Sequence, residues 1–253
     1  MLKIDLNADL GESFGPWNMG NDAEMLQIVS SANVACGGHA GDNRVMFETL
    51  RAAVANNVTI GAHPGFEDKE GFGRRRIPLT VDEVARLVAA QTGALCGVAA
   101  LAGAEVAYVK VHGALSNWAA ETAEVADAIA RATRAVMGDS AVLLAVSGTE
   151  LEKAADRAGI RAASEIFADR GYTPEGQLVP RGTAGAMIHD ADEAADRLIS
   201  FFNTGLMPTV GGDPVRLNAQ SICVHGDGPT AVEMARALRV KLEGAGFQIG
   251  SFV

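Results

Sequence analysis

Imidazole, carboxylate and ammonium side chains recur in this sequence next to short apolar runs. His39 lies in the run CGGHAGD and His63 in GAHPG. Lys110 and His112 stand two residues apart in VKVHG. Groups of these types act as general acids and bases, stabilise oxyanions and bind metal ions. Their repeated position indicates that several separate segments build one polar catalytic pocket.

Side chains two residues apart on a strand point to the same face of a sheet. Asp5, Asn7 and Asp9 are therefore expected on one face at the end of the first predicted strand, and Lys110 and His112 on one face of the fourth. Further polar and charged residues follow the predicted strands in the same way: Glu12, Glu165, Asp169, His225 and Asp227. Because an unpaired buried charge is costly, inward-pointing groups of this kind need partners or a function.

Predicted strands and amphipathic helical segments alternate along the 253 residues. The strands are expected at residues 2–6, 33–36, 59–62, 107–111, 142–146, 162–167 and 221–224. The helices are expected at residues 22–31, 44–56, 81–102, 122–137, 149–158, 192–202 and 230–245. This alternation predicts a parallel sheet in one α/β domain over residues 1–253, an incomplete or seven-stranded (β/α) barrel. Residues 203–220 interrupt the pattern, and three interpretations of this segment remain: a small hairpin, a lid or an interface loop.

Barrel enzymes place their active sites at the carboxyl ends of the strands, where four of the five histidines are expected. Some of the polar residues also admit a structural interpretation, as strand caps or turn-forming groups: Asp5, Asn7, His39 and His63. Two cysteines and one histidine are predicted to be ordinary packing or surface residues: Cys36, Cys223 and His189.

The net charge of −10 excludes some classes of function. A diffuse acidic surface repels phosphate backbones, so we expect no nucleic-acid partner. Three widely spaced cysteines without a CxxC argue against a disulfide framework and a structural zinc site. The N-terminus lacks the layout of a signal peptide, and the longest apolar stretch, residues 94–109, is too short to span a bilayer. We therefore expect a cytoplasmic protein without a membrane partner.

The run EGFGRRR at residues 70–76 combines glycines with adjacent arginines, which suits bidentate capture of a carboxylate or phosphate. Arg74 or Arg75 is predicted to hold such an anion, with Arg170 and Arg181 adding positive charge near the pocket mouth; a solvated loop is the alternative. The signatures GxxxxGK[ST] and GxGxxG after a strand do not occur in the sequence, whereas the letters of GxSxG occur once, in GESFG at residues 11–15. Neither a P-loop nor a Rossmann site is therefore expected. A serine nucleophile is not expected either, because no predicted helix directly follows GESFG, as the strand–turn–helix elbow requires.

Six ordered blocks of the sequence resemble the LamB/YcsF family, the family of 5-oxoprolinase A subunits. They are DLNADLGE, ACGGHAGD, GAHPGF with EGFGRR, VKVHGAL, EIFADRGY and VHGD, and they run from residue 5 to residue 227. The charged residues of these blocks are kept, whereas five positions depart from the usual pattern: Gly38, Asn43, Gly65, Val111 and Ser116. The resemblance implies a seven-stranded relative of the glycoside hydrolase/deacetylase barrel.

The resemblance also implies an ATP-dependent cyclic amide hydrolase that opens 5-oxoproline to L-glutamate together with two partner subunits, B and C. ATP is then the expected cofactor, a divalent ion could accompany it, and the sequence itself does not require a metal. We hypothesise that Asp9, His63 or His112 acts as general base on water and that Lys110 stabilises the oxyanion. The residues expected to bind substrate are Asp5, Asn7, Glu12, His39, Asp42, Arg74, Arg75, Glu165, Asp169, Arg170, His225 and Asp227.

Two other classes of function remain open. A metal-dependent deacetylase or amidohydrolase could hold zinc through Asp9, His39 and His63 and leave one position open for water. The chain could also be a non-catalytic binding or regulatory subunit. In that case the complex would keep full activity when residues of the pocket are mutated.

Overall fold

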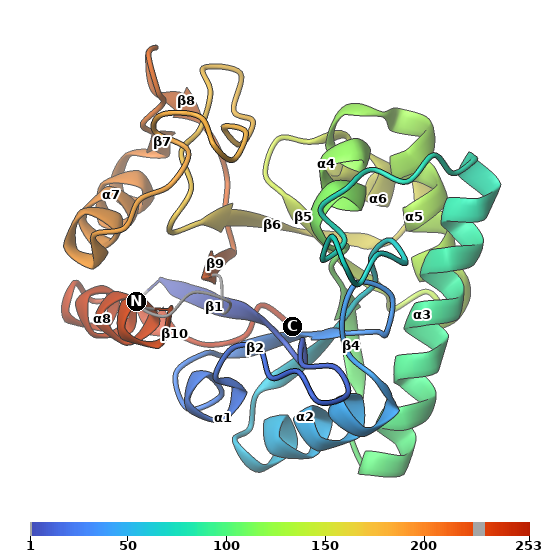
Figure 1. Ribbon diagram of the computed structural model, residues 1–253. Helices are drawn as coiled ribbons and strands as arrows, with labels where there is room; N and C mark the ends of the chain where they lie inside the picture. Colours follow the sequence, from blue (N-terminus) through green and yellow to red (C-terminus); the bar gives the residue numbers. More distant parts are fainter. Residues whose placement is uncertain (1, 225–230) are drawn as a thin grey trace.

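Seven parallel strands close into a barrel in the computed structural model, which describes residues 2–224 and 231–253 (Figure 1). Around the barrel the order is β1, β2, β3, β4, β5, β6 and β9, and β9 closes it by pairing with both β6 and β1. The strands are β1 Lys3–Leu10, β2 Ser31–Ala35, β3 Thr59–His63, β4 Val106–Val109, β5 Val142–Val146, β6 Arg161–Phe167 and β9 Ser221–Val224. The predicted seven-stranded α/β barrel is confirmed.

Three short strands lie outside the barrel wall. β10 (Gln248–Ile249) pairs in parallel with the start of β1. β7 (Leu206–Met207) and β8 (Val215–Arg216) pair with each other in antiparallel fashion. Residues 203–220 therefore contain a small hairpin, one of the three possibilities that the sequence left open.

The helices cover the outside of the barrel. They are α1 Asp22–Met25, α2 Asn43–Ala55, α3 Val81–Ala102, α4 Gly113–Glu121, α5 Ala123–Met137, α6 Glu150–Ala158, α7 Ala191–Thr204 and α8 Ala231–Gly244. α3 packs against α5 on one flank and α7 packs against α8 on the opposite flank (Figure 1). The helix expected at residues 22–31 is shorter because Ser31 already pairs with Asn7 as part of β2. Helix α4 was not expected, because His112 begins it without a side-chain cap.

Helix α3 is long and apolar enough, by length and composition, to cross a membrane. A capping box of Thr80 and Glu83 starts this helix, and Val84, Val88 and Leu95 are buried against the rest of the fold. The packed helix of a globular protein meets the same criteria, so α3 carries no argument for a membrane role.

Strand β1 explains why the barrel interior is polar. Its even-numbered residues are apolar and belong to the core between barrel and helices: Ile4, Leu6, Ala8 and Leu10. Its odd-numbered residues Asp5, Asn7 and Asp9 point the other way, into the barrel, because side chains alternate along a strand. The expectation that the first strand ends at Leu6 is wrong: β1 continues to Leu10. The three polar residues therefore form a ladder along the inner wall instead of following the strand.

Gly61 on β3 leaves the space that Tyr108 occupies. A Cβ atom at Gly61 would lie 2.2 Å from the ring of Tyr108, which is fully buried. We expect Gly61→Ala to destabilise the fold by about 1–3 kcal/mol, since a rigid aromatic ring must move. Gly97→Ala on α3 is the matched control, because nothing lies within 4 Å of that position; it should raise stability by up to about 1 kcal/mol. Urea denaturation of both variants checks the difference, and equal effects would contradict this packing.

Candidate active site

Asp5 lies at the deepest rung of the polar ladder on β1. Its carboxylate accepts hydrogen bonds of 2.6 Å from Ser30 and of 2.6 Å from Ser31, and another from Ser221. The residue is fully buried and does not line the cavity described below. Burial raises the pKa of this carboxyl group, although the three serine hydroxyls act in the opposite direction. This geometry places Asp5 in the floor of the barrel, outside the lining of the cavity.

Asp5→Asn tests this placement through the pH dependence of stability. Because the folded-state pKa lies above the unfolded value, the unfolded chain gives up this proton first as the pH rises. The contribution of this carboxyl group to the free energy of unfolding therefore falls as the pH rises from about 4 towards the folded pKa. We expect the variant to gain stability relative to the wild type at pH 7, more than at pH 4, in urea titrations. Turnover and KM should stay unchanged; a large rise in KM would instead make Asp5 a substrate ligand.

Lys110 follows β4 and is enclosed by four acceptors. Its Nζ lies 2.7 Å from Glu165 Oε2, 3.0 Å from Cys223 Sγ, 3.1 Å from Asp9 Oδ1 and 3.2 Å from Asn7 Oδ1. An ammonium group has only three protons to donate, so the four contacts cannot all be hydrogen bonds at once. When a further oxygen enters, Lys110 can therefore donate a hydrogen bond to it in place of one of the four present acceptors.

The protonation states around Lys110 follow from its neighbours. Burial alone would lower the pKa of the ammonium group, but the carboxylates of Asp9 and Glu165 outweigh it and raise that pKa well above the usual value. Burial raises the pKa of the Cys223 thiol well above its usual range. At neutral pH the centre thus holds a fixed ammonium cation beside a neutral thiol, which suits Lys110 to stabilising negative charge.

Asp9 links Lys110 to the histidines. Its Oδ1 accepts a hydrogen bond of 2.8 Å from Asn33 Nδ2 in addition to the Lys110 contact, and its Oδ2 lies 3.3 Å from His63 Nε2. Tyr108 donates a hydrogen bond of 2.6 Å to Asn33 and so fixes that amide. Burial alone would raise the pKa of Asp9, but His63 and Lys110 lower it well below its usual value. Asp9 is therefore a carboxylate at neutral pH.

Four buried residues form what we call the imidazole cage: Glu12, His39, His63 and His112. One potential ligand atom from each lies within 4.8 Å of all the others. The rings of His39 and His112 stack at 3.7 Å, and Glu12 Oε1 lies 3.2 Å from His39 Nε2. Burial lowers the pKa of His112 to about 3 and that of His39 well below its usual value, so both rings are neutral. Neutral imidazoles and a carboxylate are the donors that transition-metal ions prefer.

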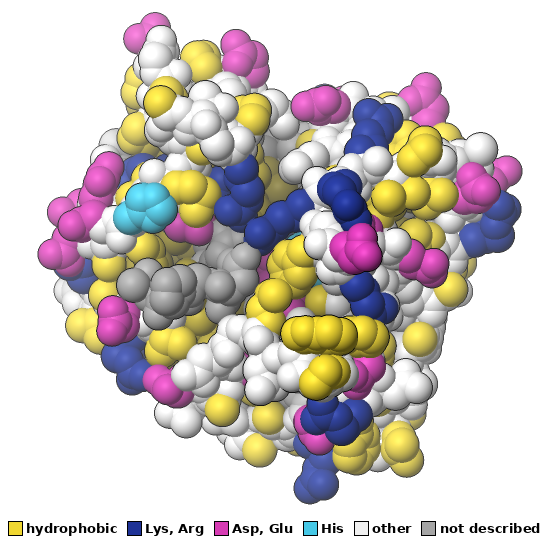
Figure 2. Space-filling view, viewed as in Figure 1, with side chains coloured by type: hydrophobic (Ala, Val, Ile, Leu, Met, Phe, Trp, Pro, Cys, Tyr) yellow, Lys and Arg dark blue, Asp and Glu magenta, His cyan; other side chains and the backbone are white. Residues whose placement is uncertain are grey.

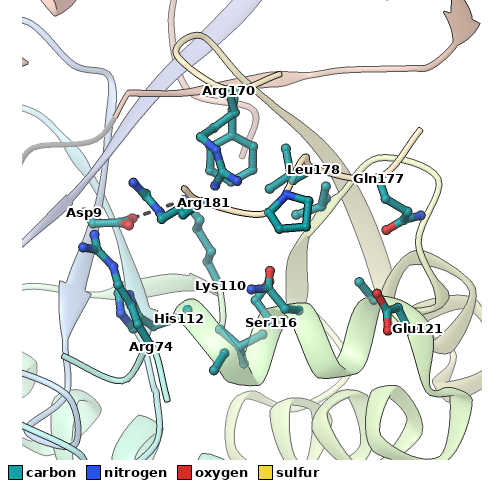
Figure 3. A pocket seen from close by; sticks show the side chains of 18 of the residues that line it. Asp9, Arg74, Lys110, His112, Ser116, Glu121, Arg170, Gln177, Leu178 and Arg181 are labelled. Atoms are coloured by element: carbon teal, nitrogen blue, oxygen red, sulfur yellow. Dashed lines mark hydrogen bonds and ion pairs between the residues drawn. The ribbon is translucent and has the colours of Figure 1, made fainter. Parts of the chain in front are cut away.

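A cavity of about 410 Å³ opens above Asp9, Lys110 and His112. Helix α4 contributes Ser116, Asn117 and Glu121 to its wall, and the loop after β6 contributes Gln177, Leu178 and Pro180. Figure 3 shows Asp9, Lys110 and His112 at one end of this cavity and Gln177 and Glu121 at the other.

Three arginines line the same cavity: Arg74, Arg170 and Arg181. Arg170 is held in place, since it donates hydrogen bonds to the carbonyl oxygens of Val179, at 2.6 Å, and Ala186, at 3.2 Å. Burial, followed by the neighbouring Arg181, lowers the pKa of Arg170. Lys and Arg side chains gather beside the hollow on this face (Figure 2). The chain is acidic as a whole, yet its pocket is suited to an anion.

The structure does not bring every predicted residue to the cavity. Arg75 binds Asp68 on a surface loop, and its side chain is 60% exposed. Asp42 caps α2 by accepting a hydrogen bond from the backbone of Val45. Asp169 is buried but does not line the cavity. His225 and Asp227 lie outside the described residues.

Several residues of the site were not predicted as such. Cys223 contacts Lys110 and is more than the packing thiol that was expected. Asn33 and Tyr108 fix Asp9 from within runs that the sequence presents only as strands. Asn33 shares the odd–even register of Asp9 on the neighbouring strand, a pairing that only the sheet register reveals. The polar face of α4 was missed together with the helix itself.

Known proteins resemble this chain over its whole length. The model of the LamB/YcsF family matches residues 4–253. A protein of Azorhizobium caulinodans, named as the A subunit of 5-oxoprolinase, is 50% identical over 252 residues, which are 100% of this chain and 99% of that protein. A protein of Pseudomonas syringae pv. tomato that bears the same subunit name is also 50% identical, over 100% of this chain and 98% of its own length.

Solved structures share the fold. The lactam utilization protein from Thermus thermophilus is 42% identical and superposes with a TM-score of 0.94, over 99% of this chain and 100% of that one. A protein from Enterococcus faecalis V583 covers 99% of this chain at a TM-score of 0.62, but at 12% identity it shares the architecture alone. With a family model and relatives at half identity that both span the barrel and its polar interior, the chain belongs to the LamB/YcsF family.

Proposed function

We propose that this chain is the A subunit of a 5-oxoprolinase, which opens 5-oxoproline to L-glutamate at the expense of ATP together with subunits B and C. The observation that carries the proposal is the position of one charged ammonium group, Lys110, and one carboxylate, Asp9, at the end of a cavity lined by arginines. The names of the relatives, which describe A subunits, support the assembly with other subunits.

The cavity fits a small anionic lactam. 5-Oxoproline carries one carboxylate and one ring carbonyl group, so it needs a cationic site and an oxyanion site a few ångströms apart. Arg74 and Arg181 supply the first on the cavity wall, and Lys110 supplies the second (Figure 3). The planar guanidinium group binds a carboxylate through two parallel hydrogen bonds.

An entering carbonyl oxygen accepts a hydrogen bond from Lys110 Nζ and replaces one of its present acceptors. Asp9 is the acceptor that loses its hydrogen bond, because Asp9 lines the cavity whereas the Glu165 side chain is 1% exposed and does not line it. Once its contact with Lys110 weakens, Asp9 becomes a stronger base, since that ammonium group is one cause of its low pKa. Asp9 is then placed to accept a proton from the water that attacks the ring carbon.

ATP makes the ring opening favourable. The terminal phosphoryl group of ATP passes to the lactam oxygen and ADP leaves. Water then attacks the ring carbon and gives its proton to Asp9, the carbon–nitrogen bond breaks, and the nitrogen takes up a proton. A second water releases phosphate from the resulting acyl phosphate, so two waters are consumed for each glutamate. The sequence contains no P-loop, so ATP is not held in that manner by this chain.

Glutamate and phosphate release test the proposal. This chain is mixed with partner subunits B and C, 5-oxoproline and ATP, and each component is left out in turn. We expect equal amounts of glutamate and phosphate only from the complete mixture. Glutamate formation without ATP, or full activity in the absence of this chain, would contradict the proposal.

The imidazole cage favours a second candidate, a metal-dependent amide hydrolase. Its residues differ in part from the predicted set of Asp9, His39 and His63, because Glu12 and His112 join the two histidines. Hydrolysis of amide substrates by this chain alone, without ATP and inhibited by chelators, would favour this candidate. Full activity of complexes whose cavity residues are mutated would favour a non-catalytic role instead.

A further inference from the structure

The contact between His63 and His112 leaves two lone pairs facing each other. His63 Nδ1 lies 2.7 Å from the carbonyl oxygen of Lys110, and His112 Nε2 lies 2.8 Å from that of Phe72. A carbonyl oxygen only accepts hydrogen bonds, so both of these ring nitrogens carry the proton. If both rings were neutral, the other two nitrogens, His63 Nε2 and His112 Nδ1, would both be acceptors, although they are only 3.0 Å apart.

Two buried acceptors at this distance repel each other unless a cation lies between them. Either a proton or a metal ion resolves the conflict. A shared proton needs only the two nitrogens, but carboxylate oxygens that could also bind a metal ion lie near the same point. Glu12 Oε1 lies 3.9 Å from His112 Nδ1, and Asp9 Oδ2 lies 3.3 Å from His63 Nε2.

The spacing of these donors fits one coordination shell. Ligand atoms about 2.0–2.1 Å from a tetrahedral metal ion are separated by roughly 3.3 Å. His112 Nδ1 lies 3.0 Å from His63 Nε2 and 3.9 Å from Glu12 Oε1, on either side of that value, and the ligand atoms of the cage all lie within 4.8 Å of one another. Small rotations of the side chains therefore suffice to place a metal ion.

We propose that the imidazole cage binds one divalent transition-metal ion of the zinc or cobalt class through His63 Nε2, His112 Nδ1 and Glu12 Oε1. Two imidazoles exclude magnesium and calcium as the preferred ions, since those take oxygen ligands. When bound there, the ion would acidify a water molecule next to Asp9. The site does not depend on the identity of the substrate proposed above.

His39 acts as a positioning residue for Glu12. Its Nε2 lies 3.2 Å from Glu12 Oε1, and its ring stacks on His112. Its Nδ1 is buried without a hydrogen-bond partner among the described residues, so Nε2 is the nitrogen that donates. Outer residues of this kind hold a carboxylate ligand in orientation.

Cobalt titration of the isolated chain tests the site without substrate, ATP or partner subunits. After removal of metal by chelation, the wild type should bind one Co²⁺ per chain and develop visible absorption bands. His63→Ala and His112→Ala should abolish them, and His39→Ala should weaken binding on the order of 10–100-fold. His189→Ala is the matched control, since His189 is exposed and outside the cage, and it should bind as the wild type does.

A wild type that takes up no Co²⁺, or a His63→Ala variant that retains the bands, would overturn the proposal. Circular dichroism shows whether each variant folds. Where an alanine variant does not, nitrogen NMR of the wild type decides: Zn²⁺ must shift His63 Nε2 and His112 Nδ1 but leave His189 unchanged, and unshifted cage nitrogens would overturn the site. Because no turnover is measured, failure here leaves the ring-opening assay untouched.

Discussion

Lys110→Met is expected to lower the turnover of 5-oxoproline by at least about 10²–10³-fold, the usual effect of removing one oxyanion donor. Lys110 is the cation that lies in contact with Asp9 at the end of the cavity, and its raised pKa keeps it charged. Methionine keeps most of the volume of the side chain but offers no proton. Steady-state release of glutamate from the assembled complex measures the effect, which should appear mainly in kcat.

The loss of Lys110 also strands buried carboxylates, so its effect on folding needs a control. Glu165 is 1% exposed and pairs with Lys110 at 2.7 Å. Breaking a buried pair on one side costs about 3–5 kcal/mol of stability. The double variant Lys110→Met/Glu165→Gln removes the stranded charge and should recover much of that stability in urea titrations while turnover stays low. Recovered turnover in this double variant would show that Lys110 serves the fold and not the reaction.

Asp9→Asn is expected to lower turnover by about 10²–10⁴-fold, the range for removal of a general base. The amide oxygen can still accept the hydrogen bond from Asn33, so the geometry of the wall should persist. What disappears is the negative charge that takes the proton from water. Single-turnover experiments with ATP should show slow glutamate formation even though 5-oxoproline still binds.

Asp42→Asn is the matched control for Asp9→Asn. Asp42 belongs to another block of the family pattern, but its side chain caps α2 and lies outside the cavity. Asparagine caps a helix about as well as aspartate but gives up the hydrogen bond that Asp42 Oδ2 accepts from the backbone of Gly15, so stability should fall by about 1 kcal/mol while turnover stays near that of the wild type. Equal losses in the two variants would mean that Asp9 has no special role.

The barrel could be predicted from the sequence because local patterns carry it. Short β-rich runs alternate with amphipathic segments, and this order permits few topologies. The boundaries were less accessible. The continuation of β1 from Leu6 to Leu10 follows from pairing with β2 through residues such as Asp9 and Asn33, and pairing is a long-range property.

The core of the site could be predicted as well, since strand-end residues meet at one end of a barrel. Asp9, His63, Lys110 and His112 do lie together on that cavity. The direction of each remaining side chain could not be predicted. Arg74 and Arg75 are neighbours in the sequence, yet one lines the cavity and the other pairs with Asp68.

Depth inside the barrel was the other property that the sequence did not reveal. Asp5 and Asp9 share one face of β1, but four residues of rise separate a serine-lined floor from the cavity. Cys223 looked like a packing residue because its contact with Lys110 spans 113 positions of the chain. Such contacts are fixed by the closure of β9 onto β1.

A structure of the assembled complex with 5-oxoproline bound, in the absence of ATP, tests most directly whether this cavity is the place of ring opening. We predict the lactam oxygen within hydrogen-bonding distance of Lys110 Nζ, the carboxylate against Arg74 or Arg181, and Asp9 facing the ring carbon. A ligand bound outside this cavity, or one whose carboxylate occupies the place next to Lys110, would contradict the account.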